Sequence, residues 1–138
     1  MGLSTVDAET GPIAAASALE ILTGAAFVVD PSLLSRLLFG QGLDDTGTIV
    51  GRTAGLVLAF LAIGCWPRLT TGGRSTAALE ALLLLNGLVS VYLIYLSVTG
   101  LAYGPLLWPE VVAHGVNTVL LARAWVRKRG FAVRGAKG

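Results

Sequence analysis

The sequence is poor in the side chains that bind metals and form disulfides. It has one cysteine, Cys65, one histidine, His114, and one methionine, Met1. Zinc, copper and haem sites usually draw several ligands from these residue types, so we expect no metal and no other cofactor in a single chain. A lone cysteine also excludes a disulfide framework.

Charge is scarce as well. Charged residues make up 13% of the 138 residues, against about 25% in a typical globular protein. Hydrophobic residues make up 54%, and the mean hydropathy is +0.76. A chain this small has too much surface for its volume to hide that apolar material from water. The composition therefore predicts an integral membrane protein and excludes a disordered one.

Four apolar stretches are long enough to cross a bilayer, because a helix rises about 1.5 Å per residue and the hydrocarbon core is about 30 Å thick. The expected spans cover about residues 12–29, 47–66, 76–99 and 105–126. Pro31, Pro67 and Pro105 separate them, since proline ends helices. With no linker between domains, we expect residues 1–138 to form one all-α, integral membrane four-helix bundle.

The basic residues predict an orientation. Four spans put both chain ends and the loop between the second and third spans on one side of the membrane. Seven of the ten lysines and arginines fall there, namely Arg68, Arg74, Arg127, Lys128, Arg129, Arg134 and Lys137. The opposite side has only Arg36, beside Asp30, Asp44 and Asp45. The positive-inside rule then predicts a multi-pass protein of a bacterial-type inner membrane with both termini in the cytoplasm.

Residues 127–138 form the expected basic cytoplasmic tail. Lysine and arginine next to a membrane attract anionic lipid, so the lipid bilayer accounts for this tail and nucleic acid is not an expected partner. On the other side, residues 31–40 (PSLLSRLLFG) are too few to span. Their leucines have helical spacing, which predicts a short helix along the outer interface. It is either a connector or a lid over a substrate.

Three glycines in the second span are spaced four residues apart: Gly47, Gly51 and Gly55. Small residues at this spacing allow helix backbones to approach closely in a membrane. We expect them to pack helices within the bundle, with a homo-oligomer contact as the alternative.

Two pairs of opposite charges lie at matching depths. Counting about 1.5 Å per residue, Arg52 and Glu110 are both about 7 Å below the outer surface. Glu80 and Arg123 match on the cytoplasmic side. The spacing predicts two buried ion pairs, Arg52 with Glu110 and Glu80 with Arg123. The alternative is that the arginines extend to the nearest interface.

Four polar residues fall near the middle of the bilayer: Glu20, Asn86, His114 and Asn117. Glu110, His114 and Asn117 share one helix face. Polar groups at this depth are costly, which marks them as candidate functional residues. They either form a hydrogen-bonded plug between helices, or a site in which a Glu–His pair holds or relays a proton.

Catalysis has no support in the sequence, which lacks a serine–histidine–aspartate arrangement and a glycine-rich phosphate loop, so we do not expect an enzyme. Several segments resemble small four-helix bacterial membrane proteins of unassigned function. They are LLFG (37–40), GRTAG (51–55), CW (65–66) and LLWP (106–109). This resemblance implies a fold and no activity. Residues 17–21 (SALEI) also resemble the glutamate segment of small multidrug resistance transporters, but that family's later aromatic and glycine signatures are missing.

Two functions remain open. The first is a non-enzymatic accessory or structural subunit of the inner membrane, acting in a homo-oligomer or a larger membrane complex. The second is a small proton-linked transporter or ligand-binding carrier that works through Glu20 and His114.

Overall fold

The computed structural model is built from five helices. It describes residues 5–67, 69 and 73–135, except for the side chains of residues 5–8, 73–74 and 131–135. Within those ranges there is no strand. The helices are α1 (Thr5–Val29), α2 (Pro31–Phe39), α3 (Asp45–Gly64), α4 (Gly73–Val98) and α5 (Leu107–Gly135).

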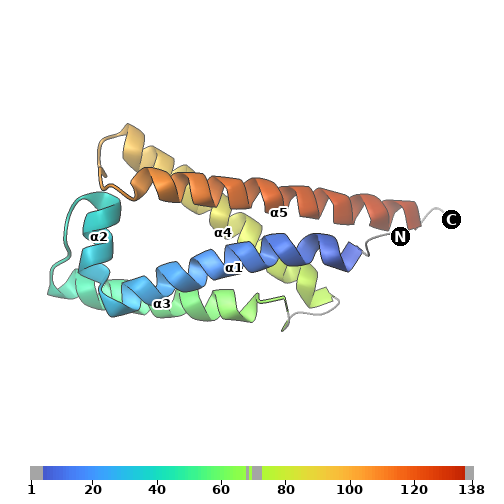
Figure 1. The fold of residues 1–138 in the computed structure, drawn as a ribbon, viewed down its shortest axis with the longest axis horizontal. Helices are drawn as coiled ribbons and strands as arrows, with labels where there is room; N and C mark the ends of the chain where they lie inside the picture. The colour runs from blue at the N-terminus through green and yellow to red at the C-terminus, as the bar shows by residue number, and fades with distance from the viewer. Residues whose placement is uncertain (1–4, 68, 70–72, 136–138) are drawn as a thin grey trace.

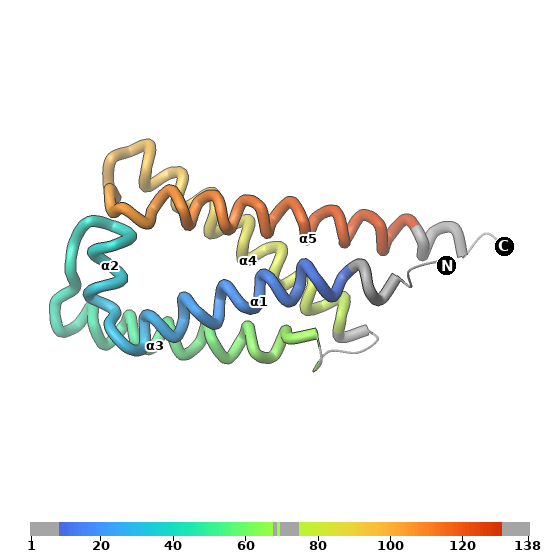
Figure 2. Tube along the Cα trace, viewed as in Figure 1, coloured from blue at the N-terminus to red at the C-terminus, as the bar shows by residue number. Residues whose placement is uncertain are grey.

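The four long helices lie lengthwise, and the short α2 lies across one end of the molecule (Figure 1). α1 packs along α3, and α4 packs along α5, while α1 also contacts α4 and α5. The start of α1, the end of α3 and the end of α5 lie at one end, which we call the termini end (Figure 2). We call the opposite end, where α2 and the α4–α5 connection lie, the α2 end.

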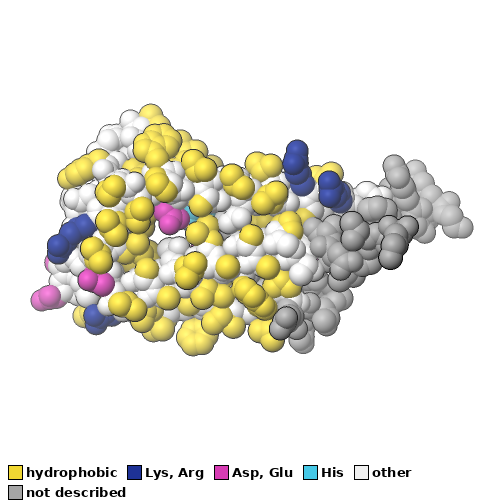
Figure 3. All heavy atoms as spheres, viewed as in Figure 1, with side chains coloured by type: hydrophobic (Ala, Val, Ile, Leu, Met, Phe, Trp, Pro, Cys, Tyr) yellow, Lys and Arg dark blue, Asp and Glu magenta, His cyan; other side chains and the backbone are white. Residues whose placement is uncertain are grey.

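Three helices contain segments that are long and apolar enough to cross a membrane, namely Glu9–Val29 in α1, Asp45–Gly64 in α3 and Ser75–Val98 in α4. The sequence predicted four such spans. The fourth long helix, α5, is not among the three, because Glu110, His114 and Asn117 lower the mean hydropathy of its first half and basic residues follow from Arg123 onward. Hydrophobic side chains cover much of the face seen in Figure 3. A surface of this kind suits contact with lipid.

Two helices extend beyond the predicted spans. α1 begins at Thr5 and contains Pro12 in its interior, although a span was expected to start there. α5 continues to Gly135, so residues 127–135 of the expected basic tail are helical. Residues 136–138 of that tail lie outside the described residues. Arginine and lysine favour helices, and no proline interrupts this segment, which explains the extension.

The short helix predicted over residues 31–40 is present as α2. The Asp30 carboxylate accepts a hydrogen bond from the Leu33 N–H at 2.9 Å, and Pro31 occupies the first turn, where its missing N–H has no cost. Gly40 ends the helix with φ = 82°, a conformation that favours glycine. One face of α2 is buried, and it is formed by Pro31, Leu34, Ser35 and Leu38.

α2 also joins the two helix pairs. The carbonyls of Leu37 and Leu38 accept hydrogen bonds from the N–H groups of Leu106 and Gly104 in the α4–α5 connection, at 2.8 and 3.2 Å. A Cβ atom at Gly104 would overlap the Leu37 carbonyl. The last turn of α2 thus satisfies its free carbonyls with another part of the chain rather than with solvent.

Glycine brings the backbones of α1 and α3 into direct contact. A Cβ atom on Gly55 would lie 2.6 Å from the Gly24 carbonyl oxygen, and one on Gly24 would lie 2.7 Å from that of Gly55. A Cβ atom on Gly51 would instead lie 2.8 Å from the side chain of Pro31, the first residue of α2. Gly47 does not reach α1, since its nearest neighbours are Asp44 and Leu43 just before α3. Two of the three predicted packing glycines therefore lie in a helix contact within the chain.

The buried apolar residues form two clusters that differ in which helices they join. The cluster toward the termini end includes side chains from α1, α4 and α5, namely Ile13, Ala16, Ala78, Leu79, Leu82, Leu121 and Ala124, together with Cys65. The cluster toward the α2 end joins α4, α5 and their connection through Leu93, Leu96, Ala102, Leu107 and Val111. α1 thus contributes to the first cluster and not to the second.

Candidate functional site

Three helices bring polar side chains together in the interior. Glu20 comes from α1, Asn86 from α4 and His114 from α5, and they are 1%, 0% and 3% exposed. Glu110 lies one turn before His114 on α5 and faces the same imidazole. We call Glu20, Asn86, Glu110 and His114 the central cluster.

Asn86 orients the His114 ring. The Asn86 Nδ2 donates to the Leu82 carbonyl at 3.0 Å, so its Oδ1 is left as the acceptor. The His114 Nδ1 lies 2.9 Å from this Oδ1. An acceptor at that distance requires a proton on Nδ1, which assigns the tautomer of a neutral ring from its hydrogen bonds. The free position of the ring is therefore Nε2.

Two carboxyl groups flank the same imidazole. The Glu20 Oε1 is 3.5 Å from Nδ1, and the Glu110 Oε2 is 3.4 Å from Nε2. Neither oxygen has a hydrogen-bond partner among the described residues, and neither does the buried hydroxyl of Ser17, one turn before Glu20. A ring that can gain a proton thus lies between two groups that would stabilise its positive charge.

The central cluster reaches the surface on one side only, at Glu110. The Glu20 side chain is 1% exposed, whereas that of Glu110 is 20% exposed. Figure 3 shows acidic atoms beside histidine atoms near the middle of the face that it draws, among hydrophobic side chains and uncharged atoms. Glu110 lies in the first turn of α5, where a negative charge is favoured by the helix dipole.

Asn117, the fourth polar residue predicted near the midplane, lies apart from this arrangement. It is buried, with 8% exposed, one turn beyond His114. In the part of the chain that is described, no hydrogen bond links it to Glu20, Asn86 or His114. Spacing along α5 placed it on the right face, but a further turn along the axis separates it from the other helices' polar groups.

The predicted ion pair between Arg52 and Glu110 is not formed. Arg52 is exposed, and no acidic side chain of the described residues lies within ion-pair distance of it. α3 packs against α1 rather than α5, and its contact face carries Gly51 and Gly55. Glu110 faces His114 instead. Equal depth in the membrane did not determine which helices are neighbours.

The predicted ion pair between Glu80 and Arg123 is also replaced by other partners. Glu80 Oε1 accepts a hydrogen bond from the Trp125 indole N–H at 3.0 Å and lies 3.6 Å from Arg129 Nη2. The Arg129 guanidinium stacks on the Trp125 ring, 4.0 Å from its centre. Trp125 and Arg129 share a face of α5, while Arg123 lies about 200° away from Trp125 at about 100° per residue. Arg123 is exposed.

A second polar group, which the sequence did not predict, lies at the termini end. Glu9 of α1 is 7% exposed. Its Oε2 is 2.7 Å from the Lys128 Nζ of α5 and accepts a hydrogen bond from the Ser75 hydroxyl of α4 at 2.9 Å. We call Glu9, Ser75 and Lys128 the terminal cluster. The sequence did offer one indication of this contact. An even number of spans places the two chain ends on the same side of the membrane, where residues of α1 and α5 can meet.

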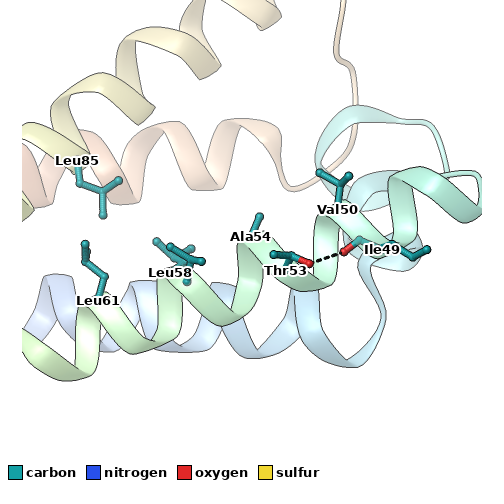
Figure 4. Close-up of a pocket in the computed structure, with 8 residues that line it drawn as sticks. Ile49, Val50, Thr53, Ala54, Leu58, Leu61 and Leu85 are labelled. Carbon is teal, nitrogen blue, oxygen red and sulfur yellow. Dashed lines mark hydrogen bonds between the residues drawn. The ribbon is translucent and has the colours of Figure 1, made fainter.

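Two grooves among the described residues are apolar and have no lining residue from the central cluster. One of about 620 Å³ lies between α3 and α4 (Figure 4), lined by Ile49, Val50, Thr53, Ala54, Val57, Leu58, Leu61 and Leu85. Another of about 400 Å³ lies between α4 and α5 and is lined by residues such as Gly87, Ser90 and Gly115. Across the described ranges, no group of three or more His, Cys, Asp or Glu is arranged to hold a metal ion.

Comparison with known proteins adds no family. No family model matches the chain, and neither a curated protein nor a solved structure matches it. The class of protein therefore follows from the chain itself, which is all-helical and has three helices able to cross a membrane.

Proposed function

We propose that the protein is a four-span inner-membrane protein whose central cluster binds and exchanges a proton, as the working site of a small proton-linked carrier. α5 is the proposed fourth span. Its polar residues His114 and Asn117 are buried, while Val112, Val116 and Val119 are 61%, 52% and 55% exposed, which suits a helix with one face in lipid. Arg127, Lys128 and Arg129 of α5 lie at the termini end, which supports cytoplasmic termini.

The observation that carries the proposal is the single imidazole between two carboxyl groups whose facing oxygens lack hydrogen bonds. In a purely structural plug, nearly every buried polar atom is expected to have a partner. Here the partnered atoms orient the ring, the unpartnered Glu110 Oε2 lies beside Nε2, where a proton would be gained or lost, and the unpartnered Glu20 Oε1 lies on the Nδ1 side.

A proton step can be written with the residues present. A proton on the Glu110 carboxyl transfers to Nε2 of His114, while Nδ1–H stays bonded to Asn86. The ring becomes an imidazolium, and the Glu20 and Glu110 carboxylates on either side stabilise its charge. Return of the proton to Glu110 restores the neutral ring. A ligand that competes with this proton must itself be positively charged or rich in hydrogen-bond donors.

The test uses the fact that His114 is the only histidine. With ¹⁵N-histidine in lipid nanodiscs, nuclear magnetic resonance reports the charge and tautomer of this one imidazole as the pH is varied. The proposal expects the ring to gain and lose a proton, with a response that Glu110→Gln alters and that Glu80→Gln, outside the cluster, does not. A ring that stays neutral and in one tautomer at every pH where the protein is folded would reject the proposal.

A structural role is the second candidate. It is favoured by the hydrogen bond between Asn86 of α4 and His114 of α5, which is the kind of contact that holds membrane helices together. In this case the protein would be a non-enzymatic subunit of a homo-oligomer or larger membrane complex. The structural role would be supported if the His114 ring never changed charge and the protein purified as a homo-oligomer or together with a partner protein.

The orientation has its own test. In a Cys65→Ala background, Leu33→Cys on α2 should react with a membrane-impermeant thiol reagent outside intact cells, because Leu33 is 51% exposed. Leu69→Cys, 60% exposed near the end of α3, should react only after the cells are opened. The opposite pattern would reverse the proposed topology.

A further inference from the structure

Polar and apolar layers alternate along α1, α4 and α5. At the termini end lies the terminal cluster, with one residue from each helix. Next comes an apolar layer, also with residues from each helix, formed by Ile13, Leu79, Leu82 and Leu121. The central cluster follows. At about 1.5 Å per residue, Glu9 and Glu20 are about 16 Å apart along α1, which leaves room for two turns of apolar side chains.

The apolar layer closes the route between the two polar clusters. Ile13 is 2% exposed, and the three leucines are 0% exposed. None of these side chains can accept a proton or form a hydrogen bond with a water molecule. A charge crossing this layer would lose its hydration without compensation, which is strongly unfavourable in a medium of low dielectric.

The terminal cluster holds this layer together from outside. Its ion pair is mostly removed from water, since the side chains of Lys128 and Glu9 are 30% and 10% exposed. It joins the first turns of α1 to the last part of α5, and the Ser75 hydroxyl adds α4. The same three helices supply Ile13, Leu79, Leu82 and Leu121 of the apolar layer. Separation of Glu9 from Lys128 would free the helix ends that keep the layer closed.

The α2 end is not closed in the same way. The second apolar cluster joins α4 to α5 without α1. Glu110, on this side of His114, is the member of the central cluster that reaches the surface. The central cluster is therefore exposed beside Glu110, on the side of His114 nearer the α2 end, and is covered by the apolar layer toward the termini end.

We propose that the terminal cluster is a lock: while Lys128 is paired with Glu9, the central cluster exchanges only through Glu110 at the α2 end, and breaking the pair opens the route from the termini end. The inference rests on the proposed function, because it treats the central cluster as a site that must be reached. It adds a regulatory contact to that site. Lys128 lies about two helical turns beyond Leu121 of the apolar layer.

The experiment measures access to Ser17, which is 0% exposed and lies between the apolar layer and Glu20. Ser17→Cys is placed in a Cys65→Ala background, in nanodiscs, and its reaction with iodoacetamide is timed. Adding Lys128→Met should speed the reaction about tenfold or more, since loss of one partner of a buried ion pair shifts a two-state equilibrium by at least that factor. Adding Arg127→Met, which removes an exposed neighbouring charge, should leave the rate unchanged.

General loosening is separated from opening by Ala62→Cys, a buried site on α3, which supplies no residue to the terminal or the central cluster. Its rate should stay unchanged with Lys128→Met. Equal rates with Lys128→Met and Arg127→Met, or equal acceleration at Ser17→Cys and Ala62→Cys, would overturn the lock. If Lys128→Met fails to fold, Glu9→Gln breaks the same pair and keeps the shape of the side chain.

A second readout needs no introduced cysteine. Exchange of the His114 ring N–H with water should also be faster with Lys128→Met than with Arg127→Met, and equal exchange would count against the lock. Failure of the proposed function would look different. In that case His114 in the unmodified protein would not change charge with pH, whatever the effect of Lys128→Met on labelling.

Discussion

The central and terminal clusters lie on the same three helices, yet their carboxyl groups are satisfied in opposite ways. In the terminal cluster, Glu9 Oε2 has a lysine and a hydroxyl within 2.9 Å. In the central cluster, the facing oxygens of Glu20 and Glu110 are 3.5 and 3.4 Å from His114 and lack hydrogen bonds. A carboxylate with strong donors is held in place, whereas the carboxyl groups that face an imidazole without a hydrogen bond form the proposed site of proton exchange.

Position explains part of this contrast. Glu9 lies near the helix ends, where long side chains such as that of Lys128 can follow the helix surface and reach it. The central cluster is too deep for a lysine or arginine from either end to reach. Its charge partner is therefore His114, which can be neutral when no proton is present. Three substitutions should distinguish the two clusters, and their expected effects on stability decrease in the order given.

Lys128→Met should have the largest effect, lowering the free energy of unfolding in detergent by about 3 kcal/mol, because it leaves Glu9 buried without its charge partner. Arg127→Met on the same helix should change it by less than about 0.5 kcal/mol, as is usual for an exposed side chain. Chemical denaturation of both variants would compare them directly. A loss of similar size in the two would mean that the terminal cluster contributes no more than a surface charge.

Asn86→Leu should have an intermediate effect. It removes the acceptor of the His114 Nδ1–H and the donor to the Leu82 carbonyl, which should cost about 1–3 kcal/mol. It should also release the ring, so the ¹⁵N spectrum of His114 should report a mixture of tautomers in place of one. A single unchanged tautomer would show that a group other than Asn86 orients the ring.

Glu20→Leu should have the smallest effect on stability, within about 1 kcal/mol of the native protein. Asn86 and His114 still bond each other in its absence, and replacing a poorly satisfied buried charge by an apolar group is often neutral. Its effect should appear in the pH dependence of His114, which loses a stabilising carboxylate on the Nδ1 side. Glu20→Gln is the matched variant of the same shape. A loss of several kcal/mol with Glu20→Leu would favour the structural role of the cluster.

Spacing along one helix was a reliable guide, and pairing between helices was not. Glu110 and His114 were predicted to share a face of α5, and they are in contact across one turn. By contrast, matching depth suggested Arg52 as the partner of Glu110, and Arg123 as that of Glu80. Depth in the membrane gives only one of the three coordinates of a residue, and many arrangements of the helices place two residues at the same depth. The identity of the neighbouring helix and the rotation of each helix decide the contact.

The sequence by itself determined the helical nature of the chain, the three apolar segments able to cross a membrane and the caps of α2. Each of these follows from local composition or from a few neighbouring residues such as Asp30, Pro31 and Gly40. Only the tertiary structure decided that Glu9 pairs with Lys128, 119 residues away, and that His114 lies between Glu20 and Glu110. Such contacts depend on how α1, α4 and α5 rotate against one another. That rotation is set by close packing, with the Gly24–Gly55 contact holding α1 against α3, and packing is a property of facing surfaces rather than of any one segment.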